Sequence, residues 1–331
     1  MRSRGDRKLV RELSTYVAEQ VFGGWEKLPN KLASGELSET AINPDRGSAS
    51  HVLQGENEEE ENRFTRLYRE IARRNAKMVA HWQAYAFTNG VLNTDNTSIF
   101  GLSIDFGPFA FLDNFDPNYT PNHDDHMLRY SYRNQPGIIW WNLVRLGEAL
   151  GELIGAGARC DEDEFINEGV SKQWADELIK RAETIIEKTG EEYKAVFMAE
   201  YKRLMTARLG LKQQKAEDFD VLFSELLDTL EALELDFNHT FRKLSNFKMA
   251  ELETDEQRQD MAGHFFHHEG LSDMVGSEDD ARARIAKWLE KWHTRVLEDW
   301  GEGKDADREA AMKKVNPKVS LVADVQQYFS C

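Results

Sequence analysis

The 331-residue sequence has few cysteines, no excess of basic residues and no long hydrophobic run. Its two cysteines, Cys160 and Cys331, form no C-x-x-C motif, which argues against a thiolate zinc site or a disulfide framework. The formal net charge of −17 argues against a nucleic-acid partner, because nucleic-acid binding relies on a basic face. No apolar run approaches the about 18 to 20 residues that cross a bilayer. We therefore expect a folded protein of a reducing compartment without a membrane span.

The most informative segment is a predicted β-hairpin. β-branched and aromatic residues on both sides of Gly101 predict two brief strands, 98–100 and 102–104, joined by a tight reversal at the glycine. Such a hairpin would hold Asn96 at its entrance and Asp105 at its exit. We therefore expect these two side chains to lie close together in space.

An amide oxygen and a carboxylate that meet at the open end of a hairpin are suitable ligands for Mg²⁺ bound to a nucleotide. Magnesium prefers hard oxygen ligands, and one or two protein groups usually hold it together with phosphates. Asp95 directly precedes the amide, so it could face the reacting phosphate as a base or an orienting group. Asp105-Phe106-Gly107 matches the metal-binding triplet of protein kinases. An Asx-turn over 93–96 followed by an ordinary core hairpin would explain the same residues without any ligand.

Further motifs surround this hairpin. They are Gly90-Val91-Leu92-Asn93-Thr94-Asp95-Asn96, Ile104-Asp105-Phe106-Gly107-Pro108-Phe109, Phe111-Leu112-Asp113, Asn122-His123-Asp124-Asp125 with Arg129-Tyr130, Gln135-Pro136, Trp141-Asn142-Leu143 with Arg145-Leu146, Thr240-Phe241-Arg242 with Leu244-Ser245, and Asn316-Pro317. Together they closely resemble the selenoprotein O, or YdiU-like, protein adenylyltransferase family over most of residues 60 to 317.

The resemblance implies a kinase-like enzyme that transfers AMP from ATP to Ser, Thr or Tyr hydroxyls of protein substrates. Asp95 would accept the proton of the attacking hydroxyl, while Asn96 and Asp105 would hold Mg²⁺ or Mn²⁺ and so bind ATP. Transfer of the γ-phosphate is disfavoured, because kinases place the catalytic Asp five positions before the Asn and here the two are adjacent. Asn89 stands where the family usually carries His. Loss of that imidazole is expected to weaken the hydrogen bonds that orient the catalytic loop, which would lower efficiency more than metal binding.

The predicted fold is mainly α with a small β-hairpin element. By resemblance it is the large, C-terminal lobe of a kinase-like protein with a family-specific helical extension. Apolar residues at helical spacing predict helices over 7–22, from about 62 to 87, and over 138–154, 164–188, 191–209, 216–233, 237–244, 282–300 and 305–314, with a short polar joint at 212–215.

The chain is expected to consist of an N-terminal helix and loop insertion (1–56), a catalytic core (57–160), a helical extension (161–317) and a divergent tail (318–331). The small-lobe motifs of the family are not found, so we expect the small lobe to be absent and the chain to be a truncated form. A catalytically inactive, pseudokinase-like scaffold is therefore the alternative function. The resemblance implies a mitochondrial location, as in eukaryotic relatives, or otherwise a cytoplasmic one. The sequence indicates no oligomeric state.

Two histidine-containing runs could be interpreted as metal sites. The run 122–126 has His, Asp and His at a spacing that transition metals use, but the resemblance favours a structural loop. His264, His267 and His268 lie near Glu269, yet no glutamate stands between the histidines as in H-E-x-x-H. An exposed helix end is the simpler interpretation.

Overall fold

The computed structural model describes residues 6–28, 61–266 and 277–318. Within these ranges the chain is mainly helical, as predicted, with one two-stranded sheet. It divides into two compact units, which are described separately below. No helix in the described ranges is both long and apolar enough to cross a membrane. Most of the predicted insertion, the tail from residue 319 and the histidines at 267 and 268 lie outside the described residues.

Unit 1 comprises residues 1–80, 92–105 and 135–200. The helix predicted over 7–22 is confirmed, because α1 continues directly into the π-helix η2. The predicted helix from about 62 is also confirmed as α2. The elements that lie wholly or mostly in this unit are α1 (Arg7–Tyr16), η2 (Val17–Val21), η3 (Trp25–Lys27), α2 (Arg63–Ala84), η4 (Thr94–Asn96), α3 (Gln135–Ala149), α4 (Gly151–Gly155), η6 (Gly157–Asp161), α5 (Asp163–Glu168) and α6 (Ala175–Arg208).

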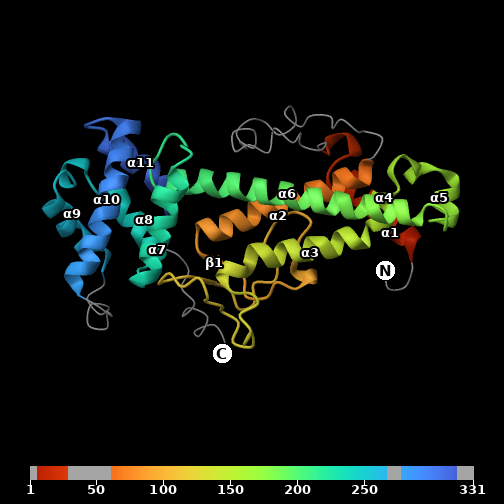
Figure 1. Cartoon of the computed structure of the whole chain (residues 1–331), viewed down its shortest axis with the longest axis horizontal. Coiled ribbons are helices and arrows are strands. Elements are labelled where there is room, and N and C mark those ends of the chain that lie inside the picture. Colours follow the sequence, from red (N-terminus) through yellow and green to blue (C-terminus); the bar gives the residue numbers. More distant parts are fainter. Residues whose placement is uncertain (1–5, 29–60, 267–276, 319–331) are drawn as a thin grey trace. The chain divides into compact units, whose positions relative to one another are not determined.

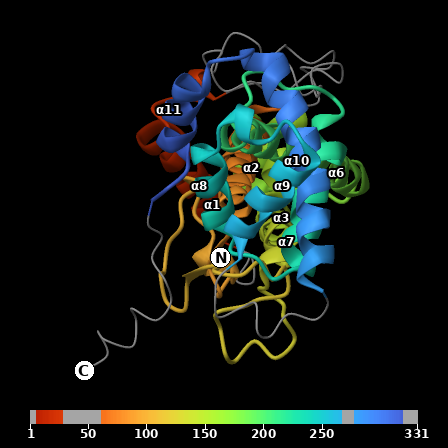
Figure 2. The ribbon, with the colours of Figure 1, turned by 90° about the vertical axis from the view of Figure 1, so that its left-hand side faces the viewer.

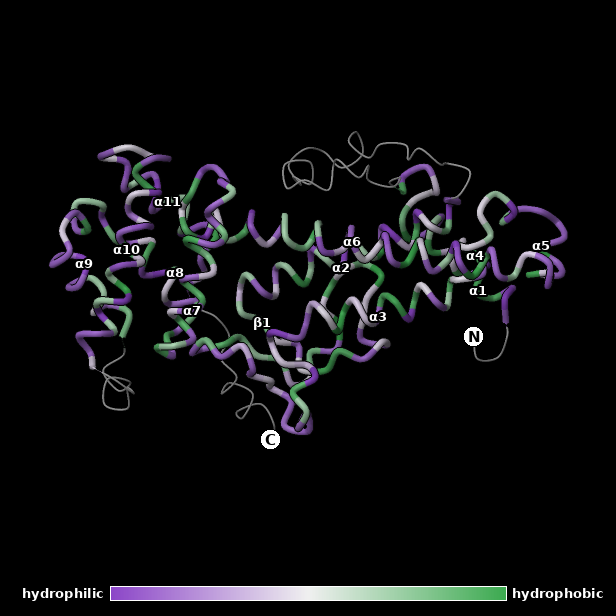
Figure 3. Tube along the Cα trace, viewed as in Figure 1, coloured by the Kyte–Doolittle hydropathy of each residue, from purple (hydrophilic) through white to green (hydrophobic). Residues whose placement is uncertain are grey.

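The core of unit 1 forms where α2, α3, α4 and α6 pack together (Figure 1). The Tyr68 hydroxyl donates a hydrogen bond of 3.1 Å to the Leu143 carbonyl, so its polar end is satisfied inside the core. Along these helices the hydropathy alternates between hydrophobic and hydrophilic residues (Figure 3), as one buried face requires. The buried side chains of the core include Phe64, Tyr68, Leu150, Leu153, Ile154, Leu178, Ala182 and Ile185.

Helix α6 corrects the prediction of two helices with a break near residue 190. It is one continuous helix of 34 residues, and only the short α5 stands apart from it. Gly190 does not end the helix, because it serves a close contact with Trp140 of α3. A Cβ atom at this position would lie 2.6 Å from Cζ2 of that indole. The glycine is therefore a packing residue and not a helix breaker.

A buried ion-pair network joins α2 to α6 inside unit 1. Arg69 contacts Glu192 at 2.5 Å and Glu61 at 2.8 Å, and Arg73 also pairs with Glu192. Burial by itself lowers the pKa of Arg69, but attraction to Glu192 and Glu61 outweighs it and leaves that pKa raised. Because an isolated buried charge is costly, each member depends on its partners.

Unit 2 comprises residues 81–91, 106–134 and 201–331. The helices predicted over 216–233, 237–244, 282–300 and 305–314 are confirmed, whereas α9 was not predicted. Helix α10 packs against α7 and α9, and α8 packs against α11 (Figure 2). Its elements are β1 (Phe87–Thr88), β2 (Ala110–Phe111), η5 (Tyr132–Asn134), η7 (Phe219–Ser224), α7 (Glu225–Ala232), α8 (Phe237–Asn246), η8 (Met249–Glu251), α9 (Asp255–Ala262), η9 (Gly263–Phe265), α10 (Glu278–Trp300) and α11 (Asp305–Val315).

A fully buried arginine, Arg208 at the end of α6, organises part of unit 2. Its side chain donates hydrogen bonds of 2.9 Å to the side-chain oxygens of Asn316 and Asn238 and another to the Ala84 carbonyl. The guanidinium lies 3.9 Å from the ring centroid of Phe241, a cation–π contact. Burial lowers the pKa of Arg208 to about 10. Amide oxygens and an aromatic face thus stabilise this cation.

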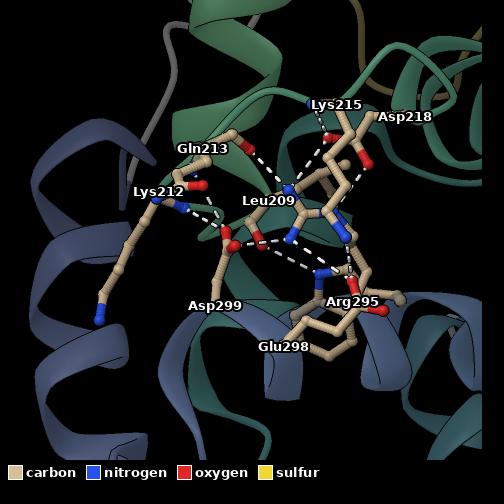
Figure 4. Close-up of polar contacts among 9 residues, drawn as sticks. Leu209, Lys212, Gln213, Lys215, Asp218, Arg295, Glu298 and Asp299 are labelled. Carbon is tan, nitrogen blue, oxygen red and sulfur yellow. Dashed lines mark hydrogen bonds and ion pairs between the residues drawn. The ribbon is translucent and has the colours of Figure 1, made fainter.

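The predicted polar joint at 212–215 is held by α10 (Figure 4). Arg295 pairs with Asp218 at 2.9 Å and with Asp299 at 2.7 Å, and it donates a 2.6 Å hydrogen bond to the Gln213 carbonyl. The Asp299 carboxylate in turn accepts hydrogen bonds from the backbone N–H groups of Lys212, at 2.6 Å, and Gln213, at 3.2 Å. The joint is therefore an ordered connection in this unit.

Replacing Glu192 by alanine should destabilise the protein strongly. Glu192 is 3 % exposed, and its loss leaves Arg69 and Arg73 without a shared carboxylate, which costs about 3–5 kcal/mol for a buried pair. The measurement is the denaturant midpoint followed by circular dichroism. Glu191→Ala, an exposed neighbour on the same helix, serves as the control. Equal midpoints for both variants would show that the network contributes little.

Candidate metal and nucleotide site

The predicted hairpin is a tight loop of unit 1 and not a pair of strands. Only one isolated antiparallel bridge, between Thr97 and Ser103, forms. The reversal itself is confirmed, since Gly101 has a φ of +64° and its N–H donates to the Ser98 carbonyl at 3.2 Å. Strands do not form because the intended apolar face is not buried: Leu102 is 62 % exposed, and strands need a packed face to be stable.

Asn96 and Asp105 meet across this loop, as the sequence predicted. Nδ2 of Asn96 donates a hydrogen bond of 3.2 Å to Oδ2 of Asp105. Asn96 is half-buried and Asp105 is exposed. Asp95 is exposed too and occupies the middle of η4, one residue before the amide. All the predicted site residues therefore lie in one loop of unit 1.

The backbone of Asp105 adopts a conformation that few non-glycine residues use. Its φ is +55°, in the left-handed region, where Asp is tolerated better than most residues. Such backbone strain, of order 1–3 kcal/mol, is found most often at functional sites. The surrounding fold must therefore hold the carboxylate in this orientation.

Two buried asparagines, which sequence reasoning did not assign to the site, hold the loop. Asn142 of α3 donates from Nδ2 to the Leu92 carbonyl, at 3.0 Å, and to Oγ1 of Thr97, at 2.8 Å. Asn75 of α2 donates from Nδ2 to the Ser98 carbonyl at 2.9 Å. A polar residue on the buried face of the apolar helix α3 is the signal that could have revealed Asn142, whereas the many polar residues of α2 conceal Asn75.

The donor set suits magnesium better than a transition metal. In the part of the chain that the structure describes, no group of at least three His, Cys, Asp or Glu side chains is arranged to hold a metal ion. Asn96 and Asp105 instead offer one amide oxygen and one carboxylate, which are hard ligands. Magnesium is commonly held by such a pair together with substrate phosphates, so the residues fit this ion.

The Asn-His-Asp-Asp-His run of unit 2 makes structural contacts. Nδ2 of Asn122 donates to the Gly90 carbonyl at 3.1 Å. The carboxylate of Asp125 accepts hydrogen bonds from the N–H groups of Arg129, at 2.9 Å, and Tyr130, at 2.7 Å. These contacts agree with the interpretation of the run as a structural loop. The side chain of Asn89 is buried and accepts a hydrogen bond from the Val91 N–H at 3.3 Å.

Comparison with known proteins establishes the family. The family model described as "Protein adenylyltransferase SelO" matches residues 1–329. The chain belongs to the SelO family. The resemblance seen in the sequence motifs is thereby confirmed.

Relatives with curated names lie in fungi and bacteria. The mitochondrial protein adenylyltransferase SelO of Schizosaccharomyces pombe is 42% identical over 264 residues, which cover 78% of this chain and 44% of the relative. Its counterpart in Saccharomyces cerevisiae is 34% identical over 376 residues, covering 96% of this chain and 54% of the relative. The protein nucleotidyltransferase YdiU of Pectobacterium carotovorum is 34% identical over 273 residues, covering 82% of this chain and 46% of the relative. This SelO-family chain therefore spans about half the length of these curated relatives.

Replacing Gly101 by alanine should distort the loop and lower stability. The positive φ disfavours a side chain, and a Cβ atom would collide with the Arg74 carbonyl; substitutions of this kind cost more than about 1 kcal/mol. Thermal unfolding is the measurement. Gly137→Ala is the control, since a Cβ there meets nothing within 4 Å and alanine favours a helix. If the two variants unfold at the same temperature, the loop is not constrained at Gly101.

Proposed function

We propose that this chain carries the catalytic segment of a protein adenylyltransferase, which transfers AMP from ATP to Ser, Thr or Tyr hydroxyls of other proteins. The observation that carries the proposal is the 3.2 Å contact between Asp105 and Asn96. Asn96 directly follows Asp95, and the chain belongs to the SelO family. The relatives' names support the reaction class and a protein substrate.

Each residue of the segment has a role in this proposal. The exposed Asp95 carboxylate accepts the proton of the attacking hydroxyl, as a general base does. The oxygens of Asn96 and Asp105 would hold Mg²⁺ or Mn²⁺ between the protein and the phosphates of ATP. When bound, such an ion neutralises charge that develops on the transferred phosphoryl group. The left-handed backbone of Asp105 helps to aim its carboxylate.

The finer assignments of fold and location belong to the same proposal. We assign the chain to the large lobe of a kinase-like fold, in which the long helix α2 precedes the catalytic loop, and we keep the sequence-based division at residues 56, 160 and 317. Both fungal relatives are named mitochondrial, which supports a mitochondrial location over a cytoplasmic one.

The alternative to this proposal is a catalytically inactive scaffold, which would act only by binding other proteins and would transfer neither AMP nor phosphate.

The position of the transferred label separates these functions. The 331-residue chain, and a form extended by any coding sequence that precedes Met1, are incubated with candidate protein substrates, Mg²⁺ or Mn²⁺, and ATP labelled at the α-phosphate. Label on protein supports AMP transfer. Transfer only from γ-labelled ATP would mean a kinase and would overturn the proposal. No transfer from either label would favour the scaffold.

Replacing Asp105 by alanine should abolish metal-dependent nucleotide binding, because the only carboxylate of the proposed ligand pair is lost. The effect is measured by titrating the protein with ATP in the presence and absence of Mg²⁺, using whichever of the two forms, the 331-residue chain or the extended one, binds ATP. Glu187→Ala removes the same charge from an exposed position on α6 of the same unit and should titrate like the parent. Identical curves for Asp105→Ala and the parent would remove the metal assignment.

A further inference from the structure

We propose that Asn142 and Asn75 are positioning residues for AMP transfer, acting together as an amide clamp on the catalytic segment. This inference rests on the proposed function for its chemical consequence. Its structural part stands on the contacts of the two side chains. The clamp holds residues 92–98, and therefore Asp95 and Asn96, in the arrangement that faces Asp105.

Asn142 holds the first half of the segment. It is 4 % exposed, and its Nδ2 lies among acceptors from the segment: the Leu92 carbonyl at 3.0 Å, the Asn93 carbonyl at 3.3 Å and Oγ1 of Thr97 at 2.8 Å. These acceptors come from both ends of the short η4 turn that contains Asp95. One amide group therefore fixes the turn at its start and at its end.

Asn75 holds the second half of the segment. It is 0 % exposed, and its Nδ2 donates at 2.9 Å to the Ser98 carbonyl and at 2.9 Å to the Ile71 carbonyl of its own helix. The second contact anchors the amide to α2, so the first ties the loop to that helix. The two asparagines thus attach the segment to two different helices of unit 1.

The amide oxygens indicate that the clamp serves placement more than stability. Among the described residues, Oδ1 of Asn142 and Oδ1 of Asn75 are buried without a hydrogen-bond partner. Leaving a buried acceptor unsatisfied is unfavourable, and a side chain selected for stability alone would avoid it. The amide orientation is nevertheless determined, because only the NH₂ groups can donate to the surrounding carbonyls.

Hydrogen exchange of the 331-residue chain tests the clamp without reference to activity. In Asn142→Ala, the backbone amides of residues 92–98 should exchange about 10-fold faster or more, because the segment loses its contacts to α3. Asn167→Ala is the matched control, since Asn167 is exposed and, within the described residues, its side chain bonds only to the Asp163 carbonyl of its own short helix. Unchanged exchange in residues 92–98 of Asn142→Ala would overturn the clamp.

Steady-state AMP transfer, in the form of the protein that shows it, tests the positioning role. Misplaced catalytic groups should lower kcat by about 10- to 100-fold, while KM for ATP changes little. Faster exchange with an unchanged kcat would overturn the positioning role. If the parent transfers no AMP at all, the proposed function fails, and the exchange result alone decides whether the clamp exists.

Asn142→Asp adds a readout that general destabilisation does not produce. An ionised carboxylate would face the Leu92 and Asn93 carbonyls and repel them, whereas a protonated one can donate a hydrogen bond to one of them. Burial raises the pKa of a carboxyl group, so kcat relative to the parent should recover as the pH falls. If the ratio of the variant's kcat to the parent's kcat does not change with pH, the donor role of Asn142 is contradicted.

Discussion

The candidate site depends on one constraint: a loop that forms neither a long helix nor a sheet must still satisfy its backbone carbonyls. Leu92 and Ser98, at the two ends of the segment 92–98, are buried, so water cannot readily supply hydrogen bonds to their carbonyls. Asn142 and Asn75 supply them instead. The positions of Asp95 and Asn96 follow from this arrangement, because both residues lie between the clamped points.

Buried arginines occur in both compact units, and their charges are compensated by different means. In unit 1, Arg69 is compensated by the carboxylates of Glu61 and Glu192. In unit 2, Arg208 bonds to the amide oxygens of Asn238 and Asn316 and lies against aromatic rings. The two solutions obey the same rule, since a buried charge is tolerated only where dipoles or opposite charges surround it. Asn316 belongs to the Asn316-Pro317 motif. Its contact with Arg208 joins this motif to the end of α6, which gives the motif a structural role.

Two sequence predictions failed for the same reason. The strands around Gly101 and the separation of two helices near residue 190 were both inferred from the local sequence pattern. In the first case the residues favour strands, but no apolar layer covers Leu102. In the second a glycine favours a helix end, but contact with Trp140 requires a residue without a Cβ atom. Tertiary packing overrides local preference in both places.

The sequence by itself determined the helical class, most helix positions, the family, and the proximity of Asn96 to Asp105. These features follow from periodicity, from motifs and from a short chain reversal, all of which are local. Only the tertiary structure decided that α6 is continuous, that Asp105 takes a left-handed backbone, and that Asn75 and Asn142 bond to residues 92–98. Those contacts join residues far apart in the sequence, and a buried asparagine has no partner until the chain that surrounds it is folded.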